Sequence, residues 1–161
     1  MSITLDPKTE QAVAEEVRKA AEGVRREILR NLHAAGEQAV NVARSVVSAS
    51  GYLGSGTPYT VQTGNLTSSV GYCITEDGKI VEMSSFQAVG GKKGNGAQGA
   101  DTGRKLAMQI VREFPQGYAL ILVAGMHYAS YVQELHHRDV LASAELIATK
   151  LVNELKNKFA R

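Results

Sequence analysis

The stretch SVGYCITEDGKIVEMSSFQ, residues 69–87, decides the fold because it is typical of two strands joined by a tight turn. Asp77-Gly78 is a strong signal for a two-residue hairpin, since both central positions of such a turn favour residues that tolerate positive φ. We therefore expect a hairpin over 69–87, with strands near 69–76 and 79–87. Cys73 falls inside the first strand and is expected to behave as a small buried hydrophobic residue.

Downstream of the hairpin, the run YALILVA at Tyr118–Ala124 is continuously apolar. A short run of this kind is typical of a strand buried on both faces, so we expect it to be the central strand of a small sheet. Arg104–Phe114 has the composition of a short helix that Pro115 closes. Asp139 is expected to cap a last amphipathic helix that packs on the sheet. The apolar positions of that helix are Val140, Ala144, Ile147, Leu151, Leu155 and Phe159.

Upstream of the hairpin, one long amphipathic helix is predicted to begin at Asp6-Pro7, because Asp is a favoured N-cap and Pro is tolerated at the first helical position. An unbroken helix of about nine turns measures about 60 Å and extends beyond a domain of this size. We therefore expect either a break in it or packing against another subunit. Gly23 and Gly36 are candidates for kinks or close helix contacts. The apolar residues that recur every three or four positions are Val13, Val17, Ala20, Ala21, Val24, Ile28, Leu32, Ala35, Ala39, Val42 and Val46.

Together these elements predict an α+β fold with a long N-terminal helix, a small mainly antiparallel sheet and a C-terminal amphipathic helix packed on that sheet. The hairpin 69–87 and the central strand 118–124 form the sheet. The turn-rich segment 48–60 and the glycine-rich segment 88–103 lack periodicity and are expected to be flexible loops. Neither segment separates two apolar cores, so residues 1–161 are interpreted as a single domain.

The composition excludes several classes of protein. The 161 residues contain one cysteine, which rules out an intramolecular disulfide framework and fits a reducing cytoplasm. The sequence has no apolar run of the roughly 18 to 20 residues that a membrane span needs, and its first residues do not resemble a secretory signal. A net charge of +2 does not by itself indicate a nucleic-acid partner. We therefore expect an intracellular protein with no membrane partner.

The glycine-rich segment contains one pattern with a known chemical meaning. Gly94-Asn-Gly96-Ala-Gln-Gly99 matches G-x-G-x-x-G, which binds dinucleotides when its glycines form the tight turn from a strand into a helix. Here Val89-Gly-Gly-Lys-Lys intervenes, and the predicted helix starts several residues late. The pattern is therefore interpreted as a chance match, and no cofactor is expected.

The other chemical groups do not assemble into a recognisable site in the sequence. Glu134, His136, His137 and Asp139 have metal-ligand side chains, but adjacent histidines do not easily point the same way and no second ligand group has a suitable spacing. His127 follows a strand but has no matching nucleophile in a recognisable elbow. We therefore expect no catalytic residues, no metal ligands and no enzymatic activity.

One basic group remains a candidate binding feature. Lys92 and Lys93 lie on the glycine-rich segment, and Arg104 and Lys105 lie at its far end. These four side chains are either the charges of a solvated loop or a basic arm that contacts DNA phosphates or an acidic neighbour. In a closed ring, copies of such a loop would add their charges.

Two short segments carry a resemblance to a known family. The first has the pattern T-G-x-L-x-x-S and precedes the hairpin, and the second has the pattern Y-A-x-Y-V-x-E and follows the strand at 118–124. Their motif positions are Thr63, Gly64, Leu66, Ser69, Tyr128, Ala129, Tyr131, Val132 and Glu134. In these motifs and in the order of its elements, the chain resembles the minor tail component family of long-tailed bacteriophages. Members of that family are also described as neck, tail-completion or head–tail joining proteins.

The resemblance implies a structural protein without a reaction to catalyse. It implies a homo-oligomeric ring, a hexamer or another cyclic oligomer, that completes the tail or joins it to the head and lets DNA pass. The implied partners are further copies of the chain, other neck and tail proteins such as head-completion, tail-terminator or tail-tube proteins, and the genomic DNA in the channel. The implied location is the virion, after synthesis in the host bacterial cytoplasm. Gln133 departs from the pattern, because the family usually has an acid there and here Glu134 comes one position later.

Two other classes of function stay open at this point. One is a small DNA-associated or adaptor module that uses the four basic side chains, for which DNA affinity should fall with salt. The other is an enzyme that binds a nucleotide on the glycine-rich segment, for which ATP or NAD should raise the thermal stability.

Overall fold

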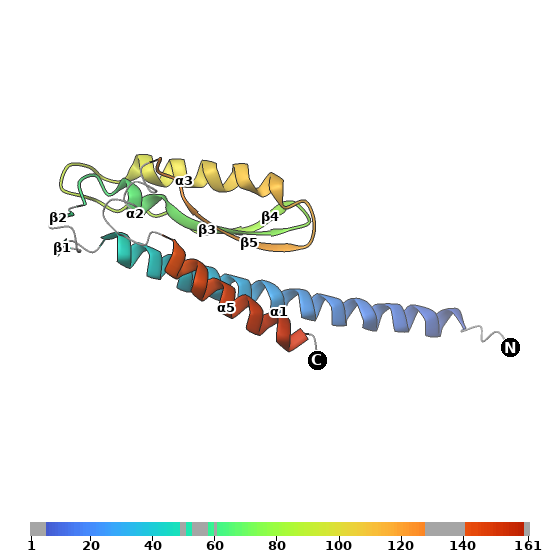
Figure 1. Ribbon diagram of the computed structural model, residues 1–161. Helices are drawn as coiled ribbons and strands as arrows, with labels where there is room; N and C mark the ends of the chain where they lie inside the picture. The colour runs from blue at the N-terminus through green and yellow to red at the C-terminus, as the bar shows by residue number, and fades with distance from the viewer. Residues whose placement is uncertain (1–5, 49–50, 53–57, 60, 128–140, 160–161) are drawn as a thin grey trace.

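The computed structural model describes residues 6–48, 51–52, 58–59, 61–127 and 141–159. Its fold is α+β, as predicted, with a long N-terminal helix, an antiparallel sheet and a C-terminal helix that packs beside it (Figure 1). The elements are α1 (Pro7–Ser48), β1 (Gly51–Tyr52), β2 (Pro58–Tyr59), α2 (Asn65–Ser69), β3 (Val70–Glu76), β4 (Lys79–Met83), α3 (Ala97–Ile110), the 3-10 turn η1 (Val111–Glu113), β5 (Tyr118–Ala124) and α5 (Ala142–Phe159).

The main sheet has three strands in the order β4-β3-β5, and both pairings are antiparallel. The central strand is therefore β3, which is buried along nearly its whole length. The prediction that Tyr118–Ala124 is the central strand was wrong, because among the described strands β5 pairs with β3 alone and forms an edge. Its apolar composition reflects the helices that cover both of its faces.

The hairpin was predicted correctly around its turn. Asp77 and Gly78 both have positive φ, 49° and 74°, as a two-residue type I′ turn requires. A bond from Gly117 N–H to the Asp77 side chain (2.9 Å) ties this turn to the start of β5. The second strand ends at Met83, earlier than the predicted residue 87.

The sheet lies between two helical layers, with α3 on one face and α1 with α5 on the other (Figure 1). Side chains of β3 and β5 alternate between the layers, as the two-residue period of a strand dictates. The buried residues on the α1 and α5 side include Leu32, Ala39, Val70, Tyr72, Ile74 and Ala144. Those on the α3 side are Cys73, Phe86, Ala100, Ala107, Val111, Ile121 and Val123.

Helix α1 is unbroken over 42 residues and begins where the sequence predicts. The Asp6 carboxylate accepts bonds from the backbone N–H groups of Lys8 and Thr9, both at 3.4 Å, and so caps the helix. The helix continues without interruption through Gly23 and Gly36, the two candidates for kinks or close helix contacts. Gly36 marks a close approach of a different kind, because a Cβ there would lie 2.7 Å from the buried ring of Tyr72 on the sheet.

The glycine-rich segment is more ordered than predicted. Residues 97–103 are the first half of α3, so the loop predicted for 88–103 and the helix predicted for Arg104–Phe114 were both misplaced. Gly99 and Gly103 lie inside the helix, where each costs up to about 1 kcal/mol relative to Ala. They are needed there because a Cβ at either position would overlap the backbone carbonyl of Asn65 or Ser69.

Helix α5 runs along α1 and closes the apolar layer on that side of the sheet. Its end is tied to α1 by an ion pair between Lys158 Nζ and Glu27 Oε1 at 2.7 Å. The predicted N-cap Asp139 and the apolar Val140 lie outside the described residues.

Candidate functional site

The T-G-x-L-x-x-S motif folds as a tight turn into a single helical turn. Gly64 has a φ of 74° and is the N-cap of α2, and its carbonyl accepts the Ser68 hydroxyl at 2.8 Å. The Ser69 hydroxyl donates to the Leu66 carbonyl at 2.8 Å. Leu66 is 3% exposed and Ser69 is fully buried. Thr63 supports the turn by accepting the Asn65 N–H at 3.3 Å.

The same turn holds the glycine-rich segment in place. The Ser68 hydroxyl accepts the Val89 N–H at 2.8 Å, and Lys93 N–H donates to the Gln62 carbonyl at 2.6 Å. A Cβ on Gly64 would overlap the Val89 carbonyl. The four described motif positions therefore help to build the chain's own fold. The other five, Tyr128, Ala129, Tyr131, Val132 and Glu134, lie outside the described residues.

The four basic candidates lie on two separate parts of the structure. Lys92 and Lys93 are exposed on the turn between Gly91 and Gly94. Arg104 and Lys105 are exposed on α3, about 10 Å along the helix from its start. Lys105 also pairs with Asp101 at 2.7 Å, which neutralises its charge locally. The structure therefore places two of these charges on the turn before α3 and two on α3 itself.

The G-x-G-x-x-G match does open a helix, because Gly96 is the N-cap of α3 and the predicted delay is absent. The space above its glycines is nevertheless occupied by the chain itself. A Cβ on Gly96 would overlap the Val89 carbonyl, and one on Gly99 would overlap the Asn65 carbonyl. These glycines serve close packing of α3 on α2, with no free cradle for a phosphate at either position.

The described residues offer no assembled catalytic or metal-binding set. Burial raises the pKa of the Cys73 thiol to about 11, so the thiol is protonated at neutral pH and is not a nucleophile. His33 contacts the Tyr72 hydroxyl at 2.9 Å and the Glu82 carboxylate, and joins α1 to the sheet. Within the described ranges, no group of three or more His, Cys, Asp or Glu is placed to hold a metal ion. His136, His137 and Asp139 lie outside those ranges.

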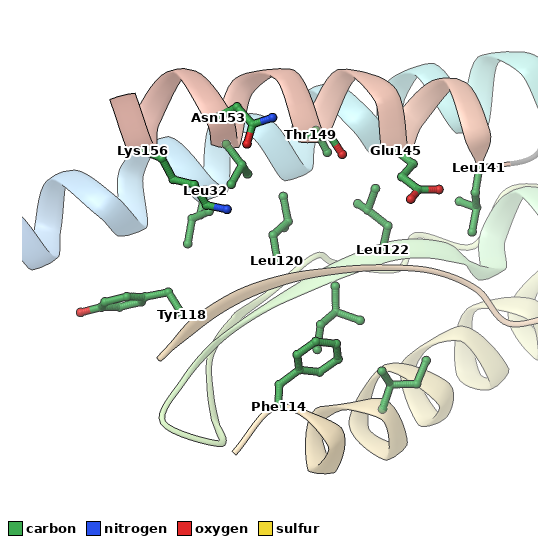
Figure 2. Close-up of a pocket in the computed structure, with 14 residues that line it drawn as sticks. Leu32, Phe114, Tyr118, Leu120, Leu122, Leu141, Glu145, Thr149, Asn153 and Lys156 are labelled. Carbon is green, nitrogen blue, oxygen red and sulfur yellow. The ribbon is translucent and has the colours of Figure 1, made fainter. Parts of the chain in front are cut away.

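A cleft of about 520 Å³ lies beside β5 (Figure 2). Leu120 and Leu122 of β5 point up toward α5, and Phe114 lies below the strand. Glu145 and Lys156 stand near opposite ends of the cleft. The remaining lining is mostly apolar and includes Leu32, Ile110, Ile121, Leu141, Ala148 and Val152.

The cleft runs along the β5 edge, where no other strand of the described residues pairs, and the two edges of the sheet differ. The β4 edge is short, has a register irregularity opposite Ile74 and Thr75, and carries Lys79 and Glu82. Such features discourage pairing with another strand. The β5 edge has seven residues, an uninterrupted register with β3, and no charge and no proline. It is therefore open to pairing.

Sequence reasoning missed this cleft and this edge. The signal was present in YALILVA, which lacks the charges and prolines that protect an edge strand. The same absence is typical of a central strand, so the pattern alone could not distinguish the two.

Comparisons of the chain with models of known protein families, with characterised proteins and with solved structures found no significant match. In the parts of the chain that the structure describes, no helix combines the length and apolarity that crossing a membrane requires.

Proposed function

We propose that this chain is a structural virion protein of the phage neck or upper tail. In this proposal copies of it form a ring that completes the tail or joins it to the head, and DNA passes through the ring. Its partners are further copies of the chain and the neighbouring neck and tail proteins. The order of the elements and the T-G-x-L-x-x-S turn support the family resemblance on which the neck location rests.

The observation that carries the proposal is the first part of α1, residues 7–24, which we call the arm. Every residue from Pro7 to Glu22 is exposed, and the arm extends past the sheet and past the end of α5 (Figure 1). The first contact with the sheet comes from Arg25, which binds Glu76 through two nitrogens. A helix this far from its own core contributes nothing to burial within one chain.

The arm nevertheless has an apolar side. Val13, Val17 and Val24 are 51%, 63% and 44% exposed, and with Ala20 they recur at steps of four, three and four residues. This spacing places them on one helical face, which we call the arm stripe. An apolar stripe that its own chain does not cover indicates a protein contact. A contact between the arm of one copy and a different surface of the next is heterologous, and such contacts form a ring when the rotation from one copy to the next closes.

The proposal is tested by the oligomeric state of the purified chain, measured by light scattering after gel filtration and by electron microscopy. We expect closed rings of one size, and we expect Val17→Glu to shift the population to smaller species. Gln11→Glu adds the same charge on the other side of the arm and should leave the rings intact. A monomer at all concentrations, or equal effects of the two substitutions, would contradict the proposal.

The location has its own test. Antibodies against the chain, applied to virions that contain it, should label the junction between head and tail in electron micrographs. Labelling of the capsid surface or the distal tail would rule out the neck.

A further inference from the structure

The backbone groups of β5 that face away from β3 can be identified residue by residue. Gly125 N–H donates to the Ser69 carbonyl at 3.2 Å, and in an antiparallel ladder the bonded positions alternate from there. Every second residue of β5 therefore turns its N–H and C=O away from β3. Within the described part of the chain, no backbone group pairs with this edge. The residues with outward-facing groups are Tyr118, Leu120, Leu122 and Ala124.

The cleft beside this edge fits one bare strand better than a second sheet. Helix α5 stands over the cleft and η1 ends below it, so the position next to β5 is already covered on both faces (Figure 2). If the β5 edge of another copy paired here, the α5 helix of that copy would compete with the resident α5 for the same space. If the β4 edge of another copy paired here, its α1, which contacts β4 through His33 and Glu82, would also compete for that space. An extended segment without a helical layer meets neither obstacle.

We propose that residues 1–5 of a second copy, MSITL, add to the β5 edge as a fourth strand. This inference rests on the self-assembly in the proposed function and names the contact that the tip of the arm makes. Ile3 and Leu5 alternate with Ser2 and Thr4, which is the pattern of a strand with one apolar face. In the cleft that face meets Leu120 and Leu122, and the backbone satisfies the outward-facing groups of β5.

The same segment cannot reach β5 of its own chain. Arg25 binds Glu76, and the Tyr118 hydroxyl also donates to Glu76 at 2.7 Å, so the near end of β5 lies level with Arg25. From Asp6 to Arg25 the helix rises about 28 Å. Five extended residues span about 17 Å. Residues 1–5 are therefore too few to span the distance from Asp6 to the cleft of the same chain, and the proposed strand comes from another copy.

Charge complementarity sets the direction of the added strand. Lys156 stands over the Tyr118 end of the cleft, and Glu145 stands toward the other end (Figure 2). Asp6 directly follows Leu5. If the segment runs antiparallel to β5, Asp6 comes to the end with Lys156, whereas a parallel strand would place it toward Glu145. We infer the antiparallel arrangement.

A peptide-binding experiment on the full chain tests the inference without requiring rings. The receiving chain carries Ile3→Ser and Leu5→Ser, so that its own segment does not compete. The probe is a peptide of residues 1–8 labelled at its C-terminal end, and binding is followed by fluorescence anisotropy. We expect saturable binding that weakens at least tenfold when Ile3 and Leu5 of the peptide are replaced by serine.

Two variants of the receiving chain locate the contact. Thr149→Trp fills the cleft from an exposed position of α5 and should reduce binding at least tenfold. Leu146→Trp places the same ring on α5 outside the cleft, where Leu146 is 73% exposed, and should change binding less than twofold. Equal binding of the two peptides, or equal effects of the two tryptophans, overturns the inference. Rings without peptide binding would refute this contact and leave the proposed function standing. Peptide binding without rings would support this contact and contradict the proposed function.

Discussion

At Gly64 two separate constraints act on a single residue. Its φ of 74° is unfavourable for any residue with a side chain, and a Cβ would also overlap the Val89 carbonyl. Gly117 has nearly the same backbone conformation, with a φ of 69°, but a Cβ at that position would meet no atom within 4 Å. The pair therefore separates backbone strain from steric overlap.

We predict that Gly64→Ala lowers the free energy of unfolding by more than about 3 kcal/mol, because strain and overlap add. Gly117→Ala should lower it by only about 1 kcal/mol, from strain alone. Urea unfolding monitored by circular dichroism measures both values. Equal losses would mean that the contact with Val89 contributes nothing.

At the scale of one element, α1 contains two interior glycines with different surroundings. A Cβ at Gly23 would meet no atom within 4 Å, whereas a Cβ at Gly36 would lie 2.7 to 2.9 Å from the Tyr72 ring. Tyr72 is 1% exposed and cannot move aside without disturbing the core. Helix propensity favours alanine equally at both positions, so any difference reports the packing.

We therefore expect Gly23→Ala to raise the free energy of unfolding by about 0.5 to 1 kcal/mol, because only helix propensity changes. Gly36→Ala should lower it by about 1 to 3 kcal/mol, since overpacking outweighs the same gain. Thermal unfolding of both variants beside the parent chain decides the matter. A stabilised Gly36→Ala variant would show that the helix and the sheet can separate without loss.

The elements also show what the sequence could predict. The turn of the hairpin and the start of α1 were predicted well because their signals are local: Asp77-Gly78 for the turn and Asp6-Pro7 for the helix start. The start of α3 was missed because the close approach to Asn65 and Ser69 that requires Gly99 and Gly103 involves residues distant in sequence. The edge position of β5 and the cleft beside it depend on strand order, which no run of residues specifies.

For the whole molecule, one carboxylate links the longest helix to the end of α5. Glu27 accepts bonds from Lys158 at 2.7 Å and from Asn31, and it also pairs with Arg30. These contacts, with Lys158 the strongest, lower the pKa of Glu27 from 4.5 to about 2. A depressed carboxylate pKa contributes stability that is complete above the unfolded pKa and is lost as the pH falls through the folded one.

The stability contributed by Glu27 should therefore decline between about pH 4.5 and pH 2. We expect Glu27→Gln to lower the thermal unfolding midpoint at pH 7. The same substitution should make that midpoint less sensitive to acid between about pH 4.5 and pH 2. Glu10→Gln, at an exposed position near the start of the arm, is the matched control and should leave both unchanged. Parallel pH curves for the parent and Glu27→Gln would show that the linkage is absent.

Cys73, the chain's one thiol, has a further practical consequence. It lies in the central strand with no exposed surface, and its pKa of about 11 leaves it protonated at neutral pH. Maleimide and spin-label reagents should therefore not react with Cys73 in the folded protein. The natural chain already provides a silent background for site-directed labelling, in which a cysteine placed on the arm carries the only probe and reports distances between copies directly.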